Sequence, residues 1–164
     1  MFSTGIYDSW QIIQNEKFKG IKRHLGTLEK EIFDKRLVLD IGCGFGYFER
    51  FFDGNFIGVD KDIDMLRKHA EIFPIVLGDG NHLPFKDSSF DTVVCIDTMH
   101  FIENNDFMRV LKTGGFAIMS IFYNDDNYEE RKKTLQEKSS SLTMLTDFEI
   151  QGKEKEYVIV AVKH

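Results

Sequence analysis

Three glycines at alternate positions follow a short apolar run, and this arrangement places a ligand against bare backbone. The apolar run is Leu37–Ile41, and Gly42, Gly44 and Gly46 come directly after it. The run has no helical period, which is typical of a strand buried on both faces. Glycines allow a tight turn and a close approach to a ligand. Tyr47–Phe52 then favours a helix start, whose free N–H groups would face that ligand. The stretch therefore predicts a nucleotide-cofactor turn.

The spacing of this turn indicates which cofactor it takes. A dinucleotide fingerprint, G-x-G-x-x-G, requires glycine at position 47, where the chain has Tyr47. This argues against a dinucleotide-dependent oxidoreductase. The chain instead carries Asp40-x-Gly42-x-Gly44-x-Gly46. This acidic-G-x-G-x-G motif closely resembles that of the class I S-adenosylmethionine (SAM)-dependent methyltransferases.

The resemblance implies a cofactor and a reaction. SAM would be the cofactor and S-adenosylhomocysteine the product, with in-line transfer of the sulfonium methyl to an O, N, S or C nucleophile. Gly42, Cys43 and Gly44 would offer backbone contacts to the amino acid end of SAM. Asp40 would orient the turn or the cofactor's amino group. Because SAM is already activated, alignment and exclusion of water can supply most of the acceleration.

A second acidic residue ends the next predicted strand. Asn55–Val59 is apolar enough for a buried strand, and Asp60 follows it. An acidic residue about twenty positions beyond the start of such a turn can accept hydrogen bonds from both ribose hydroxyls. The alternative, a helix cap, suits Asp62 better. The helix that Asp62 caps is expected to run through Ile72, with a buried face made of Ile63, Leu66 and Ala70.

The loop after the third predicted strand, Ile75–Leu77, carries a further motif. Residues 78–91 resemble the D-x-x-x-L-P-F-x-x-x-S-F-D signature of methyltransferases related to ubiquinone and menaquinone biosynthesis. The family assigns Asp79 to the adenine amino group, the Gly80 N–H to a ring nitrogen, and Leu83 to packing near the adenine. The alternative is a turn capped by Asp79, with Leu83 in the core.

The chain also departs from the family pattern. Lys61 stands where the family usually has an apolar residue over the adenine, although its methylene stem could cover the ring. Asp106 replaces glutamate and Thr113 replaces proline in E-x-x-R-V-L-K-P-G-G. The segment from His100 to Arg109 is about one helical turn shorter than usual, which preserves the helix face but trims the pocket rim.

The fourth predicted strand, Thr92–Ile96, leads to the residues expected nearest the methyl group. Ligands bind at the carboxyl ends of parallel strands, so Asp97 to Phe101 should border the methyl. A neutral imidazole at His100 could take the proton from a hydroxyl or amine as the methyl arrives. The alternative is that His100 only packs or caps the following turn.

The N-terminal segment is predicted to be helical. Apolar residues recur roughly every three or four positions through Ile6–Phe33, with Lys17 and other charged residues mostly between them. Gly20 and Gly26 are candidates for splitting it. The resemblance implies that residues 1–33 fold over the cofactor cleft, with Tyr7–Trp10 as a lid for a pocket otherwise open in the monomer. The alternative is that Asp8 or Ser9 caps the helix and Trp10 packs on the sheet.

The remaining elements complete an α/β fold. Phe116–Phe122 predicts a fifth strand, Asn127–Ser139 a solvated helix, and Thr146–Gln151 with Glu156–Lys163 a closing antiparallel hairpin. The nearly apolar strand of the hairpin should lie between the fifth strand and an edge strand. The expected fold is a Rossmann-like class I methyltransferase, with a seven-stranded, mostly parallel sheet in the order 3-2-1-4-5-7-6. Helices cover both faces, in one domain over residues 1–164.

Composition sets further expectations. The 164 residues carry a net charge of −6, which argues against broad binding to nucleic acid but not against a local patch. Cys43 and Cys95 are isolated, which favours reduced, non-metal cysteines, no metal site and a cytoplasmic location. No apolar run reaches membrane-spanning length. The expected acceptor is a small molecule, with a homodimer or partner subunit covering the open pocket. The alternative function is a catalytically silent SAM-binding subunit.

Overall fold

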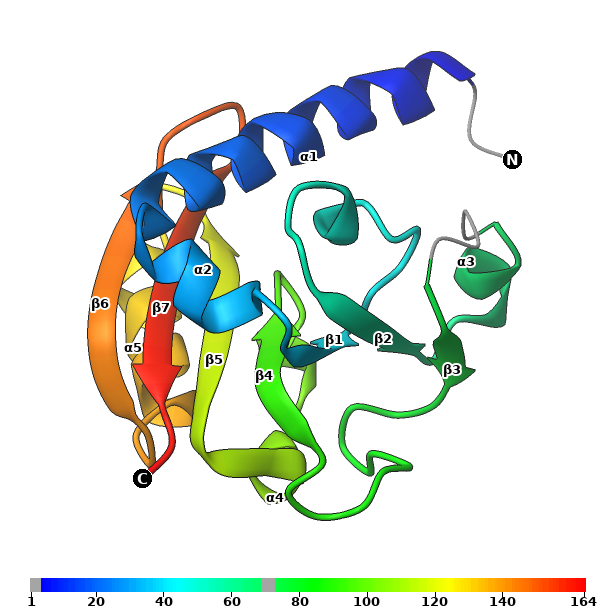
Figure 1. The fold of residues 1–164 in the computed structure, drawn as a ribbon. Helices are drawn as coiled ribbons and strands as arrows, with labels where there is room; N and C mark the ends of the chain where they lie inside the picture. The colour runs from blue at the N-terminus through cyan, green and yellow to red at the C-terminus, as the bar shows by residue number, and fades with distance from the viewer. Residues whose placement is uncertain (1–3, 69–72) are drawn as a thin grey trace.

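One sheet of seven strands organises the chain (Figure 1). The computed structural model describes residues 4–68 and 73–164, with side chains from residue 10 onward. The strands are β1 (Leu37–Ile41), β2 (Asn55–Asp60), β3 (Ile75–Leu77), β4 (Phe90–Cys95), β5 (Leu111–Tyr123), β6 (Thr143–Ile150) and β7 (Lys155–Val162). Their order is β3-β2-β1-β4-β5-β7-β6, as the sequence predicted. Only β7 runs antiparallel to its neighbours, β5 and β6.

Helices cover both faces of this sheet. They are α1 (Thr4–Leu25), α2 (Leu28–Phe33), η1 (Phe48–Arg50), α3 (Ile63–Arg67), η2 (Met99–Phe101), α4 (Phe107–Val110) and α5 (Tyr128–Lys138). One apolar core joins the sheet to α1, α2 and η1, and a second joins its other face to η2, α4 and α5. The covered sheet explains why β7, between β5 and β6, is apolar through Val158–Ala161, all of it buried (Figure 1).

The N-terminal helix is split where one of the two candidate glycines lies. Gly26 adopts φ +52° between α1 and α2, a left-handed conformation that glycine reaches at little cost. Gly20 stays inside α1, where an added Cβ would lie 2.9 Å from Ile150 of β6. The expected apolar stripe is wrong in two places, since Ile12 is 53% exposed and Lys17 only 3% exposed. Lys17 points toward the end of the sheet because it forms ion pairs there with Asp97 and Glu156.

The helix expected directly after the glycine turn is wrong. Only a single 3-10 turn, η1, forms between the turn and β2. The residues 47–54 must return the chain to the start of β2, which leaves no room for a longer helix. Phe48 stacks on Phe52 at 4.5 Å, and both rings join Phe33 of α2 in the core. Aromatic packing therefore replaces helical hydrogen bonds in this segment.

The α3 segment agrees with the sequence only in part. The Asp62 carboxylate accepts hydrogen bonds from the N–H groups of Asp64 and Met65, as expected of an N-cap. Leu66 is buried as predicted, whereas Ile63 is 44% exposed. Ala70 and Ile72 lie outside the described residues. Within the part of the chain that is described, no helix is both long and apolar enough to cross a membrane.

Candidate functional site

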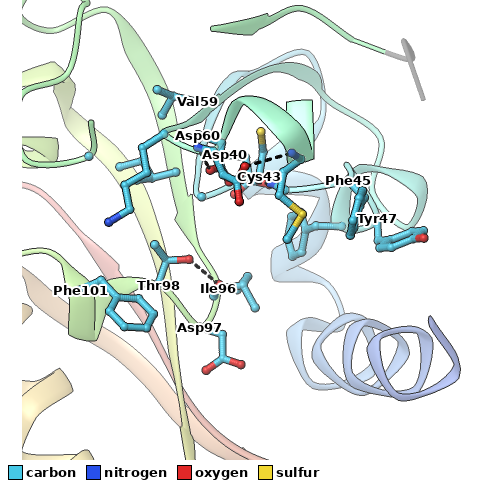
Figure 2. A pocket seen from close by; sticks show the side chains of 18 of the residues that line it. Asp40, Cys43, Phe45, Tyr47, Val59, Asp60, Ile96, Asp97, Thr98 and Phe101 are labelled. Carbon is cyan, nitrogen blue, oxygen red and sulfur yellow. Dashed lines mark hydrogen bonds between the residues drawn. The ribbon is translucent and has the colours of Figure 1, made fainter. Parts of the chain in front are cut away.

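A cavity of about 410 Å³ opens at the carboxyl ends of β1, β2 and β4 (Figure 2). Parallel strands present their ligands at this edge. Of the residues predicted from the sequence to bind the cofactor, nine line it: Asp40, Gly42, Cys43, Gly44, Asp60, Lys61, Asp79, Gly80 and Asp97. Leu83 and the predicted general base, His100, do not line it. The structure therefore brings most of the predicted site together and leaves two members outside the lining.

The glycine turn forms one wall of the cavity. Gly42, Gly44 and Gly46 all have positive φ, at +78°, +51° and +72°. A Cβ on Gly42 would lie 2.4 Å from Oγ1 of Thr98, so only glycine lets β1 approach the end of β4 this closely. A Cβ on Gly44 would meet nothing within 4 Å. A ligand can therefore approach the Gly44 backbone closely, although its N–H already donates to Asp60.

Asp60 joins the end of β2 to this turn. One carboxylate oxygen accepts the Gly44 N–H at 2.9 Å, and the other accepts the Asp62 N–H at 2.9 Å. Each carboxylate oxygen has a second lone pair, and Asp60 borders the cavity. These free lone pairs fit a ribose, although ribose binding by Asp60 stays a prediction.

The loop after β3 shows the turn that was the alternative to adenine binding. The Asp79 carboxylate accepts hydrogen bonds from the Asn81 backbone N–H at 2.9 Å and side-chain amide at 3.0 Å. These bonds lower the pKa of Asp79. Gly80 is packed closely, since a Cβ there would lie 2.9 Å from Ile41 and 3.0 Å from Ile102. Asp79 caps a turn and still lines the cavity, so its adenine contact stays a prediction.

Leu83 is held in the core by the D-x-x-R pair that the sequence singled out. The Leu83 N–H donates to the Asp106 carboxylate at 2.8 Å, and the Arg109 guanidinium donates to the Leu83 carbonyl at 3.0 Å. Arg109 also pairs with Asp106 at 2.8 Å. The pair fixes the loop against α4. Leu83 itself is 4% exposed and packs in the core, so its contact with adenine stays a prediction.

Asp40 shares its buried position with a second carboxyl group. Both carboxyl oxygens of Glu49 are buried and receive no hydrogen bond within the described part of the chain. Burial raises the pKa of Glu49, and the nearby Asp40 charge raises it further. Burial also raises the pKa of Asp40. Two carboxyl groups buried together do not both ionise easily, so Glu49 stays protonated beside Asp40 near neutral pH.

A buried charge cluster at the other end of the cavity was not predicted from the sequence. The Lys17 ammonium lies 2.6 Å from Glu156, 3.2 Å from Asp97 and 3.4 Å from Glu154. Burial alone would lower the pKa of Lys17, but Glu156 and Asp97 outweigh it and raise that pKa above its usual range. Burial raises the pKa of Glu156. No sequence motif marks the cluster, because its members are scattered over α1, the end of β4 and the β6–β7 hairpin.

Asp97 and Glu154 also line the cavity, so the cluster borders the end of the cavity away from the glycine turn. Asp97 adopts φ +58°, a strained value for a residue with a side chain. Its carboxylate accepts the Phe122 N–H at 2.8 Å as well as bonding Lys17. Carboxylate oxygens from Asp97, Glu154 and Glu156 all lie within 4.8 Å of one another. The Lys17 ammonium supplies the countercharge that this group needs.

Helix α1 contributes a wall of the cavity. Trp10, Gln14 and Phe18 line it, although α1 lies far from the glycine turn in the sequence. The Trp10 ring lies 5.9 Å from that of Phe45 and 5.6 Å from that of Tyr47, in the turn. The side chains of residues 7–9, part of the predicted lid, lie outside the described residues. Trp10 packs on the glycine turn rather than on the open sheet.

His100 lies beside the cavity. Its ring is 3.9 Å from that of Phe101, which does line the cavity. Burial lowers the pKa of His100, against the opposing charge of Asp97. Its Nδ1 is buried with no hydrogen bond from the described residues. The imidazole is therefore neutral near pH 7, and its role as a base stays a prediction.

The chain is similar to known methyltransferases. The family described as "Methyltransferase domain" matches residues 39–119. An uncharacterized protein of Methanocaldococcus jannaschii, MJ0638, is 29% identical over 162 residues, covering 89% of this chain and 72% of the relative. Human arginine-hydroxylase NDUFAF5 is 32% identical over 144 residues, covering 75% of this chain. The chain spans 64% of a further relative, MJ1123, and 41% of NDUFAF5.

The fold is also similar to that of solved methyltransferase structures. A SAM-dependent methyltransferase from Aquifex aeolicus superimposes with a TM-score of 0.67 at 17% identity. The match covers 90% of this chain and 97% of that one. At this identity the likeness concerns the fold.

Proposed function

Because the family described as "Methyltransferase domain" matches residues 39–119, we propose that this chain is a class I SAM-dependent methyltransferase that transfers the methyl group of SAM to a small-molecule acceptor. The acceptor would bind between Asp97 and α1. The observation that carries the proposal is the cavity, whose volume of about 410 Å³ falls within the usual range of small-molecule sites, about 300–1,000 Å³. The cofactor would take the end formed by the glycine turn, which leaves the Lys17 cluster for the acceptor.

The chain's own residues supply orientation and shielding. SAM, when bound, supplies an activated sulfonium methyl. Gly42 and Gly44 offer bare backbone to the cofactor's amino acid end, and Asp60 offers lone pairs to its ribose. Trp10 and Phe18 line the cavity and would keep water from it. Asp97, held by Lys17 and by the Phe122 N–H, can accept a hydrogen bond from the incoming nucleophile and orient it.

The relatives differ in what their names say they act on. They include an arginine-hydroxylase, a sterol 24-C-methyltransferase of Aspergillus fumigatus and a tRNA methyltransferase of Schizosaccharomyces pombe. The choice of a small molecule therefore rests on the cavity and on the chain's net charge of −6. A cytoplasmic site of action belongs to the same proposal, in keeping with the two free, buried cysteines.

A second candidate is a silent SAM-binding subunit that serves a partner. A similar chain of Haloferax volcanii, 18% identical with a TM-score of 0.66, was solved in complex with the Trm112 methyltransferase activator. A partner or a second copy of this chain could in the same way cover the exposed Phe101 at the cavity rim, which is 64% exposed.

Ligand-induced stabilisation tests the proposal. SAM and S-adenosylhomocysteine should raise the melting temperature of the cofactor-free protein, and NAD and NADP should not. At about 100 times Kd the expected stabilisation is about 2.7 kcal/mol. A folded protein without a response to either SAM species contradicts the proposal. Release of S-adenosylhomocysteine with a small-molecule acceptor separates the enzyme from the silent subunit, which would bind SAM without turnover.

A further inference from the structure

A second cavity adjoins the acceptor end. It measures about 390 Å³ and lies between α1 and the turn that joins β6 to β7. Figure 1 shows this turn arching beside α1. Glu154 lines both this groove and the cofactor cavity, and Lys17 of the same ion cluster lines the groove. The groove therefore borders the end of the cavity that the acceptor is proposed to occupy.

The groove carries positive charge that the protein leaves uncompensated. Lys19, Arg23 and Lys153 line it and are exposed. Within the described residues none of the three takes part in an ion pair, whereas Lys17 is paired to three carboxylates. Outside that cluster, Glu16 is the acidic residue of the lining. With Lys17 and Glu154 included, the lining holds four cations and two anions, a formal surplus of two positive charges in a chain of net charge −6.

The walls of the groove are well fixed. Gly20 lets α1 lie against β6, since a Cβ there would be 2.9 Å from Ile150. The His24 ring stacks on Phe148 of β6 at 4.5 Å, and its Nδ1 donates to the Gly20 carbonyl at 2.8 Å. Contacts between α1 and β6 therefore hold the basic side chains of α1 opposite Lys153.

We propose that this groove binds a phosphate group of the methyl acceptor, so that the acceptor is a small phosphate ester. The inference rests on the proposed function. A phosphate monoester carries about −1.5 to −2 charges at pH 7, which matches the surplus of the groove. Arg23 offers a planar fork for two phosphate oxygens, and the lysines add point charges. A long nucleic acid would need a longer basic track, which the net charge of −6 does not favour.

Calorimetry with ribose 5-phosphate as the probe, and ribose as its neutral counterpart, tests the inference. The SAM-saturated protein should bind ribose 5-phosphate at least tenfold more tightly than ribose, and added salt should weaken the difference. The triple variant Lys19→Gln, Arg23→Gln, Lys153→Gln should lose at least tenfold in affinity for ribose 5-phosphate. A matched triple, Lys30→Gln, Lys35→Gln, Lys86→Gln, removes the same charge elsewhere and should bind like the wild type.

The other outcomes overturn the inference. Equal affinities in the two triples would show that the groove does not hold the phosphate. Equal affinities for ribose and ribose 5-phosphate would show that the protein does not recognise the phosphate group. An RNA oligonucleotide that binds more tightly than ribose 5-phosphate, and only when the groove is intact, would make the occupant a nucleic acid. The SAM melting shift, measured in parallel, is expected in all three proteins. Its absence from the wild type contradicts the proposed function instead.

Discussion

The ammonium of Lys17 lies 2.6 Å from the carboxylate of Glu156 and joins helix α1 to strand β7. Lys17 is 3% exposed and Glu156 is fully buried. The contact fixes α1 at the end of the cavity where the acceptor is proposed to bind, since Lys17 also bonds Asp97 there. A single buried ion cluster thus positions both the helix and a carboxylate of the site.

Removing the Lys17 charge should destabilise the fold strongly. Lys17→Met keeps the length of the side chain but leaves buried carboxylates without a countercharge, and such losses are about 3–5 kcal/mol. Lys22→Met on the same helix breaks an exposed pair with Glu29, for which about 1 kcal/mol or less is expected. Urea unfolding of the two variants measures the difference. Equal losses would show that the cluster does not hold α1 in place.

The Asp40–Glu49 pair should make stability depend on pH. Burial raises the pKa of each carboxyl. The contribution of the protonated pair to the stability of the folded protein is therefore fully present below about pH 4.3, the usual carboxyl pKa. It is lost as pH rises above that value, because ionising a buried acid costs free energy. Glu49→Gln should flatten this loss between pH 5 and 9 and raise the melting temperature at pH 8. Glu16→Gln, at an exposed position, is the control. If the stability of Glu49→Gln depends on pH in the same way as that of the wild type, Glu49 is not the buried protonated group.

Alanine substitutions at Gly42 and Gly114 distinguish the cost of backbone strain from the cost of a steric clash. Both have φ near the same value, +78° and +77°. An added Cβ on Gly114 meets nothing within 4 Å, whereas on Gly42 it meets Thr98 at 2.4 Å. Gly114→Ala should cost about 1–2 kcal/mol from strain alone. Gly42→Ala should cost about 1–3 kcal/mol more and weaken SAM binding. Similar losses, with SAM affinity kept in both variants, would mean that close approach of β1 and β4 is unnecessary.

Asp60→Ala should weaken SAM binding by about 1.5–3 kcal/mol, the usual range for hydrogen bonds to a charged group. The glycine turn should loosen as well, because Asp60 accepts the Gly44 N–H. Asp64→Ala is the matched control, since that carboxylate is 76% exposed and pairs only with nearby Arg67 among the described residues. Calorimetry with SAM compares the two. Wild-type affinity in Asp60→Ala would contradict the ribose contact.

His100→Ala should change kcat by less than threefold with a confirmed acceptor, because His100 does not line the cavity. Its melting temperature should fall, since the ring packs on Phe101. His82→Ala, at an exposed position, should alter neither. Two results would instead support the general base predicted from the sequence. One is a loss of about 10²–10⁴ in kcat with unchanged SAM affinity, and the other is a wild-type rate that decreases when the pH is lowered below the pKa of the imidazole.

The sequence by itself determined the strands of the sheet and most of the residues that line the glycine-turn end of the cavity. Apolar runs such as Leu37–Ile41 and Tyr157–Val162 have few ways to be buried, and the strand order followed from the resemblance to class I methyltransferases. The glycine turn, Asp60 and Asp79 lie at a strand end or within two residues of one, so their place at the carboxyl edge follows from local sequence. Patterns failed where packing overrode them, as in the helix expected after Gly46, which aromatic contacts replaced with η1.

Only the tertiary structure decided the charged end of the cavity, where the acceptor is proposed to bind. Lys17 is far from Asp97 and Glu156 in sequence, and on a helical pattern it belongs to the polar face of α1. Its burial depends on how α1 crosses the end of the sheet, which no local periodicity encodes. The basic groove depends on the same crossing, because Lys19 and Arg23 meet Lys153 only once α1 packs on β6. A local sequence pattern does not predict ion pairs between residues that are distant in the sequence. Here such pairs form the part of the site that would select the acceptor.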